Sequence, residues 1–180
     1  MATIYLAGGC FWGVEKLMAS VHGVVNAESG YANGTIDSPT YRDVTTGQTG
    51  FAETVRVDYE PAVAPLPFLL DLFYEAIDPT TLNRQGNDVG TQYRSGIYYS
   101  DPADQPIIER SLTQLQERYD RPIAVEAGPL TSYTPAEGYH QDYLDKNPGG
   151  YCHIDLGLFE KAAKAVPDPS QFPDSPGVEQ

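Results

Sequence analysis

Residues 6–15 (LAGGCFWGVE) decide the fold, because they join a buried strand to an amphipathic helix. The apolar run at residues 4–7 is typical of a strand. Beyond Cys10, apolar residues at positions 11, 14, 17, 18 and 21 repeat at helical spacing. The stretch therefore predicts a strand, a tight turn and a helix, with two glycines and a thiol at the corner.

The position of Cys10 at a helix N-terminus predicts a reactive thiol. Unpaired backbone N–H groups and the positive end of the helix dipole favour a negative charge there. Such cysteines commonly have a pKa lowered from about 8.5 to about 3.5–7.5. Gly8 and Gly9 allow the turn, and Phe11 and Trp12 place two aromatic rings beside the sulfur. The alternative is that Cys10 is a buried small hydrophobe and that both rings belong to the core.

Length and composition predict one globular domain. The chain has 180 residues, of which 41% are hydrophobic and 20% are charged. Its net charge of -14 argues against a nucleic acid or an anionic membrane as a partner. No apolar run approaches the roughly 20 residues that span a bilayer, and no secretory signal is recognisable, so we expect a cytoplasmic protein, with monomer as the default state.

Cysteine and histidine usage predicts no metal site. The two cysteines, Cys10 and Cys152, show no ligand spacing with the three histidines. Two cysteines far apart in a chain of this kind are more often catalytic or redox-active than a structural disulfide.

Hydrophobic periodicity predicts the other elements. We expect strands at 24–27, 51–60, 97–99 and 123–127, and helices at 66–77, 104–119 and 139–145, with irregular stretches at 34–50 and 78–94. This order predicts an α+β domain, with an antiparallel-rich sheet packed by helices in two layers around a ferredoxin-like core, and long irregular loops. Residues 1–164 would form this domain, and residues 165–180 a Pro-rich acidic tail that is mobile or lies on the surface.

Glu53 falls on the apolar side of the strand expected at 51–60, where alternate residues share a face. A carboxyl group that loses hydration there has a raised pKa and can remain protonated, and so can donate a proton near neutral pH. The alternatives are a salt bridge to Arg42, Arg94 or another base, or a misjudged strand register.

Three polar residues of the irregular stretches are further candidates. Tyr41 and Tyr93 carry hydroxyl groups that can donate hydrogen bonds, although each is also readable as an ordinary packed tyrosine. Asp88 lies in the segment GNDVG, where a carboxylate commonly bonds local backbone N–H groups in a turn. We expect a structural role for Asp88 that supports the site.

The motif GCFWG followed by Glu15 resembles the active-site signature of the methionine sulfoxide reductase A family, the peptide methionine-S-sulfoxide reductases. Further blocks resemble the family in the same order along the chain. They lie at residues 40–44, 47–53, 86–95, 140–144 and 147–152. The resemblance covers roughly residues 4–153.

This resemblance implies thiol-dependent reduction of methionine S-sulfoxide, free or in proteins, and repair of oxidised proteins. It implies no cofactor, and thioredoxin as the external reductant of a Cys10–Cys152 disulfide. It also assigns site residues. These are Cys10 as nucleophile, Phe11 and Trp12 as the cage for the substrate methyl group, Glu53 as the acid, Tyr41 and Tyr93 as hydrogen-bond donors to the sulfoxide oxygen, Asp88 as support and Cys152 as resolving thiol.

The chain departs from the family pattern at two points. Phe51 stands where members of the family often have histidine, which changes the local polarity and not the proton donor. No cysteine follows Cys152, so two thiols must complete the reaction without a third to relay the disulfide.

Two functions of other classes compete with this interpretation. A cysteine hydrolase or acyl-transfer enzyme would need a base such as His140 within hydrogen-bonding reach of Cys10, and would not need Cys152. A non-enzymatic module that grips a peptide with its aromatic pair would not need the Cys10 thiol.

Overall fold

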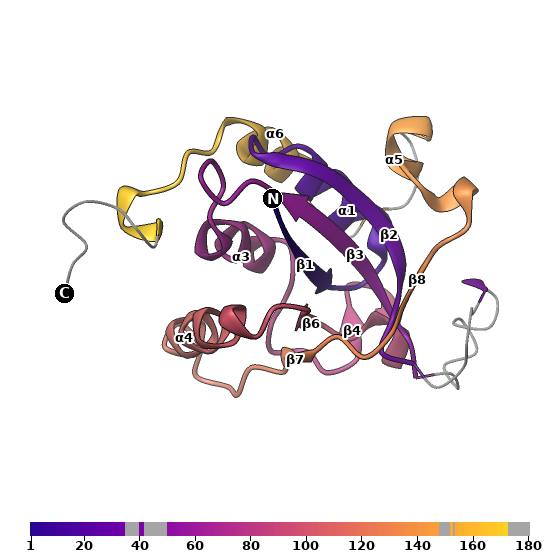
Figure 1. Cartoon of the computed structure of the whole chain (residues 1–180). Coiled ribbons are helices and arrows are strands. Elements are labelled where there is room, and N and C mark those ends of the chain that lie inside the picture. The colour runs from indigo at the N-terminus through magenta and orange to yellow at the C-terminus, as the bar shows by residue number, and fades with distance from the viewer. Residues whose placement is uncertain (35–39, 42–49, 148–151, 153, 173–180) are drawn as a thin grey trace.

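The computed structural model describes residues 1–34, 40–41, 50–147, 152 and 154–172, and within them a six-stranded sheet forms the centre (Figure 1). Its order is β7-β6-β1-β3-β2-β8. The strands are β1 (Ala2–Ala7), β2 (Val24–Ala32), β3 (Ala52–Tyr59), β6 (Gly96–Tyr99), β7 (Glu126–Pro129) and β8 (Tyr133–Pro135). A separate pair, β4 (Arg84–Gln85) and β5 (Asp88–Val89), forms a small hairpin.

Helices are spread along the whole chain. The α-helices are α1 (Phe11–Ala19), α3 (Leu66–Glu75), α4 (Gln105–Gln116), α5 (Tyr143–Lys146) and α6 (Leu156–Lys164). Short 3-10 turns lie at η1 (Thr91–Tyr93), η2 (Pro102–Asp104), η3 (Gly138–His140) and η4 (Pro169–Gln171). None of the helices in the described residues has the length and apolarity needed to span a bilayer.

The order of the first elements confirms the predicted fold class. The chain runs β1-α1-β2-β3-α3-β6, and the four strands lie side by side in the order β6-β1-β3-β2, each antiparallel to its neighbour. This is the split βαβ arrangement of ferredoxin-like folds. Strand β7 extends the sheet in parallel beside β6, and β8 extends it in antiparallel beside β2.

The main hydrophobic core lies between one face of the sheet and the helices. Alternate residues of the strands point into it and meet side chains that recur at helical spacing. Examples that are fully buried are Ile4, Leu6, Val55 and Val57 from the sheet, and Val14, Leu17, Leu69 and Phe73 from α1 and α3. The periodicities that predicted these elements are therefore the ones that build the core.

The opposite face of the sheet is covered by tyrosine side chains. Tyr5 and Tyr133 pack with ring centroids 5.1 Å apart, and the Tyr98 hydroxyl donates to Glu126 at 2.6 Å. Thr54 and Asp58 of β3 are consequently buried on this face. The half-buried strand expected at 51–60 is thus buried on both faces along nearly its whole length.

Two strands differ from the sequence expectation. Strand β2 continues through Gly30 to Ala32, five residues beyond the strand expected at 24–27, because it pairs with β3 as far as Ala32↔Ala52. The strand expected at 123–127 instead lies at Glu126–Pro129, where it pairs in parallel with β6. The backbone N–H of Ile123 is used by the Gln116 side chain, and that of Ala124 by the carbonyl of Pro79.

Three helical features also differ. Helix α6 was not predicted, although Asp155 caps its first turn through Gly157 N–H at 2.9 Å and Leu158, Phe159 and Ala162 bury one face. The helix expected at 139–145 is split into η3 and α5 by Asp142, which has a φ of 53°. The helix expected at 104–119 is the shorter α4, preceded by η2.

The first part of the expected tail packs against the domain. Gln171 in η4 donates to Asp71 of α3 at 2.9 Å, so the yellow segment in Figure 1 runs past that helix. Residues 173–180 lie outside the described residues.

Gly30 provides a test of the tyrosine layer. A Cβ atom at this position would lie 2.4 Å from the Tyr133 ring, so Gly30→Ala should destabilise the fold by about 1–3 kcal/mol through overpacking. The measurement is urea unfolding followed by circular dichroism. Gly128→Ala on β7 is the matched control, because nothing lies within 4 Å of its Cβ position. Equal stability of both variants would contradict this account of the second face.

Candidate active site

Cys10 lies at the corner between β1 and α1, as the N-terminal stretch predicts. It is the residue that caps α1, and its backbone is extended while Phe11 begins the helix. Gly9 before it has a φ of 76°, a conformation that favours glycine, and its N–H bonds the carbonyl of Tyr93 at 3.2 Å. A Cβ at Gly8 would lie 2.6 Å from Ile77, so this glycine lets the corner pack closely against the end of α3.

Glu53 points from β3 into the same site and is only 1% exposed. One of its oxygens, Oε1, accepts the backbone N–H of Phe11 at 3.2 Å, which ties β3 to the first turn of α1. The other, Oε2, is buried and has no hydrogen-bond partner among the described residues. Burial raises the pKa of Glu53 to about 8, against the smaller opposing effect of the Phe11 N–H. The carboxyl group is therefore mainly protonated at neutral pH, as the strand pattern predicts.

Neither salt bridge considered for Glu53 is found in the described residues. Arg94 pairs with Glu126 at 3.1 Å and donates to the carbonyl of Gly50 at 2.9 Å. Arg42 lies outside the described residues. The strand register is also as expected, since Glu53 shares its face with the buried Val55 and Val57.

Tyr41 and Tyr93 lie beside Glu53 with their hydroxyl groups hydrogen-bonded to each other. Burial and then the nearby Glu53 carboxylate raise the pKa of Tyr41 to about 12, and the same causes raise that of Tyr93. Both hydroxyls are thus protonated donors at any physiological pH. Asp88, in the β4–β5 hairpin, also acts on this cluster, because its charge raises the pKa of Glu53.

The Cys10 thiol is not acidic in this structure, so the pKa expected from the helix N-terminus is wrong. Burial, with Cys10 only 7% exposed, raises the thiol pKa well above its ordinary value of 9.0, and the Glu53 carboxylate raises it further. The backbone N–H of Trp12 lowers the pKa, as a helix terminus should, but by less. Desolvation of the thiolate outweighs the helix terminus.

The two aromatic residues after Cys10 occupy different environments. Phe11 is buried, with its ring centroid 5.7 Å from Tyr31 and 6.4 Å from Tyr41. Trp12 is partly exposed and stacks on Tyr143 at 3.7 Å between ring centroids, with an interplanar angle of 11°. Its indole N–H also donates to Nδ1 of His140 at 3.1 Å. The two rings follow Cys10 directly in sequence, each is held by aromatic neighbours of its own, and together they are called the aromatic wall.

Cys152 lies against the first turn of α1 as a free thiol. A Cβ at Gly13 would be 3.0 Å from the Cys152 sulfur and 2.8 Å from Ile154, so glycine is needed for this approach. Cys152 is close enough to Cys10 to raise the pKa of its thiol. Both sulfurs therefore lie at the N-terminal turn of α1. Cys10 precedes the helix, and the Cys152 sulfur lies against Gly13, about one helical turn further along.

His140 is not placed as a base for Cys10. Its Nδ1 accepts the Trp12 indole N–H, and its buried Nε2 has no partner in the described part of the chain. Burial also lowers the pKa of His140. Neither nitrogen bonds the Cys10 thiol, which removes the geometric support for a cysteine hydrolase.

Sequence reasoning missed the carboxylate that holds Tyr41. Glu137 accepts the backbone N–H of Tyr41 at 3.0 Å and the hydroxyls of Tyr31 and Tyr139 at 2.9 Å each. It also missed the support that Tyr143 gives Trp12. Glu137 lies 96 positions from Tyr41 and Tyr143 lies 131 positions from Trp12, so no local pattern reveals them.

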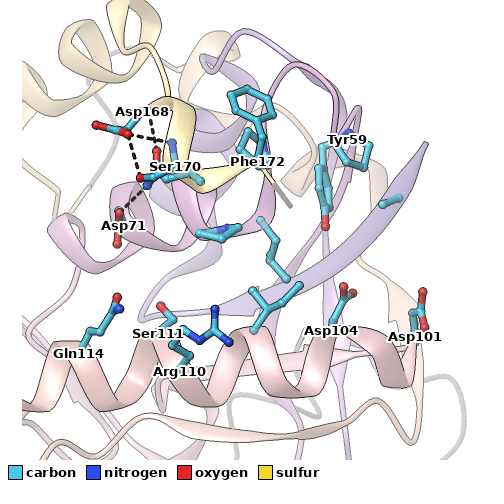
Figure 2. A pocket seen from close by; sticks show the side chains of 17 residues that line it. Tyr59, Asp71, Asp101, Asp104, Arg110, Ser111, Gln114, Asp168, Ser170 and Phe172 are labelled. Carbon is cyan, nitrogen blue, oxygen red and sulfur yellow. Dashed lines mark hydrogen bonds between the residues drawn. The ribbon is translucent and has the colours of Figure 1, made fainter. Parts of the chain in front are cut away.

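A large cavity among the described residues is remote from this site. It has a volume of about 820 Å³ and lies between α3, α4 and η4, with Tyr59, Asp71 and Asp104 among its lining residues (Figure 2). Tyr59 is six residues along β3 from Glu53, which is roughly 20 Å of extended strand. None of the candidate site residues lines this cavity. Among the described residues, no group of three or more His, Cys, Asp and Glu side chains is placed to hold a metal ion.

Known proteins resemble this chain along nearly its whole length. The sequence profile of the family "Peptide methionine sulfoxide reductase" matches residues 2–170. A relative, the peptide methionine sulfoxide reductase MsrA of Lachnoclostridium phytofermentans, is 54% identical over 163 residues, which cover 91% of this chain and 98% of the relative.

Solved structures agree with this likeness. The reduced form of Mxr1 from Saccharomyces cerevisiae superposes with a TM-score of 0.81 and 41% identity, over 86% of this chain and 91% of that chain. Mxr1 in complex with Trx2 superposes with a TM-score of 0.56 and 28% identity, over 78% of this chain and 83% of that chain.

The raised pKa of the Cys10 thiol has a measurable consequence. In a Cys152→Ser background, alkylation of Cys10 by iodoacetamide should be slow at pH 7 and should not level off below pH 9, because the thiol pKa lies above its ordinary 9.0. Adding Glu53→Gln should accelerate alkylation at pH 9, where it removes a nearby negative charge. The exposed Glu160→Gln serves as control. An alkylation rate that titrates below pH 7 would refute this assignment.

Proposed function

Because this chain belongs to the peptide methionine sulfoxide reductase family, we propose that it reduces methionine S-sulfoxide, free or in proteins, and so repairs oxidised proteins. Residues 1–164 form the catalytic domain in this proposal, and the enzyme acts in the cytoplasm as a monomer. The observation that carries the proposal is a buried acid, Glu53, whose free oxygen belongs to the same site as the Cys10 thiol.

The first step needs a proton on the sulfoxide oxygen, because that oxygen is otherwise a poor leaving group. At neutral pH the proton of Glu53 resides on Oε2, since Oε1 already accepts the Phe11 N–H. This O–H group lacks an acceptor in the described residues, and a sulfoxide oxygen supplies one. When substrate binds, the hydroxyls of Tyr41 and Tyr93 exchange the hydrogen bond between them for hydrogen bonds to the same oxygen.

The second step transfers the oxygen to sulfur. Cys10 attacks the electrophilic sulfur of the protonated sulfoxide and forms an S–S bond to it, while the S–O bond of the substrate breaks and releases hydroxide. The hydroxide then bonds the Cys10 sulfur, which breaks the S–S bond, and methionine leaves. Overall, the sulfoxide and the Cys10 thiol give methionine and Cys10 sulfenic acid, so the sulfoxide is reduced and Cys10 is oxidised. The thiol proton replaces the one that Glu53 donated, and Glu53 ends the step protonated as it began.

The third step regenerates the thiol. Cys152 attacks the Cys10 sulfenic acid, which forms a Cys10–Cys152 disulfide and releases water. Two thiols suffice because the Cys152 sulfur already packs against Gly13 in the first turn of α1. Thioredoxin then reduces the disulfide by thiol exchange and is itself oxidised. The similarity to Mxr1, whose solved complex contains Trx2, supports thioredoxin as partner.

Substrate binding relies on the aromatic wall. Phe11 and Trp12 present apolar surface to the methyl group of the substrate, while Glu53 and the two tyrosines receive its oxygen. These two contacts orient the methyl group and the oxygen of the substrate sulfur, and the preference for the S epimer is taken from the resemblance to the methionine-S-sulfoxide reductases. Asp88 supports the polar side of this site. Phe51, where relatives often have histidine, is buried and belongs to the main core.

A coupled assay tests the proposal directly. NADPH consumption in the presence of thioredoxin and thioredoxin reductase should occur with the S epimer of a methionine sulfoxide peptide and not with the R epimer. Cys10→Ser should abolish it, and Glu53→Gln should lower kcat/KM by about 10²–10⁴. In the wild type, kcat/KM should fall above pH 8, where Glu53, with a pKa of about 8, loses its proton.

Other results would favour a competing function. Turnover that persists in Cys152→Ser without thioredoxin would indicate a hydrolase. Peptide binding by Cys10→Ser with no sulfoxide reduction by the wild type would indicate a binding module. Full activity in Glu53→Gln would remove Glu53 from the acid role.

Gly13 allows the two thiol steps to be separated. Gly13→Ala adds a methyl group that would lie 3.0 Å from the Cys152 sulfur and 2.8 Å from Ile154. We expect disulfide formation to slow by roughly ten- to a hundredfold, because misplacing a reacting group by about 1 Å has effects of that size. The first methionine should still form at nearly the wild-type rate in a single-turnover experiment.

The matched control for this experiment is Gly157→Ala in α6. Its nearest contact would be Asp155 at 3.5 Å, an ordinary van der Waals distance, so both steps should keep their rates. Unchanged disulfide formation in Gly13→Ala would mean that Cys152 does not react from the position described.

A further inference from the structure

Glu15 is a buried carboxylate that the proposed mechanism does not use. It lies on α1, one turn after Trp12, and is 2% exposed. Its Oε2 accepts both the backbone N–H and the hydroxyl of Ser29 in β2, at 3.0 and 2.9 Å. Its Oε1 accepts the backbone N–H of Asp142. The side chain therefore links α1, β2 and the segment that begins α5.

The backbone that Glu15 holds at Asp142 has an unusual conformation. Asp142 has a φ of 53°, which places a non-glycine residue in the left-handed region. Gln141 next to it is fixed as well, because its side chain accepts from Ser29 N–H at 2.9 Å and donates to Ser29 carbonyl at 2.8 Å. Gln141 and Asp142 are thus both joined to Ser29 of β2, Gln141 directly and Asp142 through the Glu15 carboxylate.

The residues on either side of this tied pair are the ones that hold Trp12. His140 accepts the Trp12 indole N–H, and Tyr143 stacks on the indole ring at 3.7 Å. A shift of the backbone at 141–142 would move both contacts together. The position of the indole ring depends in this way on a carboxylate that does not touch it.

We propose that Glu15 is a positioning residue of the substrate site, which fixes the Trp12 ring by holding the backbone of Asp142. This inference rests on the proposed function, in which Trp12 contacts the substrate methyl group. An ionised carboxylate suits the role because all three groups around it are donors. Burial raises the pKa of Glu15 to about 7, against the smaller opposing effect of these hydrogen bonds.

The proposal predicts the effect of Glu15→Gln. The new amide group turns an N–H donor toward the backbone N–H of either Ser29 or Asp142. Two donors then face each other, so the hydrogen bond to that backbone N–H is lost. We expect KM for a methionine sulfoxide peptide to rise by roughly tenfold, the size expected when a hydrogen bond to a charged group is lost. The turnover number kcat should change by less than about threefold, because Cys10 and Glu53 are untouched.

Fluorescence gives a second readout that does not depend on activity. Trp12 is the one tryptophan of the chain, so emission that is excited at a wavelength absorbed by tryptophan and not by the tyrosines reports on its ring alone. Acrylamide should quench Trp12 more strongly in Glu15→Gln than in the wild type, at temperatures where both are folded. Glu160→Gln makes the same chemical change on an exposed face of α6 and should alter neither readout.

A second variant keeps the test decisive if Glu15→Gln does not fold. Glu15→Asp retains the charge but is one methylene shorter, so it cannot reach Ser29 and Asp142 together, and the same rise in KM and in quenching is expected. Wild-type KM and quenching in the folded variants would overturn the proposal. So would a fall in kcat at constant KM that follows the folded fraction. A wild type without sulfoxide reduction would instead refute the proposed function, while the quenching data would still test the positioning.

Discussion

The burial of the Glu53 carboxyl group without a cation is the constraint on which the site depends. Arg94 is engaged by Glu126, and no ion pair reaches Glu53 within the described residues. Desolvation then keeps the acid neutral at physiological pH. Because an ionised Glu53 also raises the thiol pKa, Cys10 and Glu53 resist carrying charge together. In the resting site both groups are neutral, and the proposed reaction begins when Glu53 passes its proton to the substrate and Cys10 gives up its own proton.

The first turn of α1 gathers the parts of this site from distant segments. Successive residues of a helix point about 100° apart, so neighbours in sequence contact different elements. Phe11 meets Glu53 on β3, Trp12 meets His140 and Tyr143, and Gly13 makes room for Cys152. Glu15 then joins the same helix to β2. A single turn of helix therefore relates the acid, the aromatic wall and the second thiol, which explains why the motif is so compact in sequence.

Local patterns predicted the elements whose burial follows a period. Alternation located Glu53 on the core face of β3, and helical spacing located α1 and α3, because both depend on side chains near in sequence. The missed features depend on partners far along the chain. The strand expected at 24–27 stops before Gly30, and the space above this glycine is filled by Tyr133, 103 positions later. The tie between Glu137 and Tyr41, and that between Glu15 and Asp142, likewise leave no local signal, since only the folded chain brings donor and acceptor together.

The prediction of a low pKa for the Cys10 thiol was wrong because two physical effects compete there, the helix terminus and the loss of hydration. A helix terminus stabilises an exposed charge by about 0.3–1 kcal/mol. Burying an ion costs several kcal/mol, so the terminus prevails only where water reaches the sulfur. Cys10 is 7% exposed, and desolvation prevails. Under the proposed mechanism this is an advantage, because oxidants attack thiolates and a neutral buried thiol is protected from them. In that mechanism the sulfoxide oxygen supplies the acceptor that Glu53 Oε2 lacks, so proton transfer and nucleophilic attack become favourable only when substrate is bound.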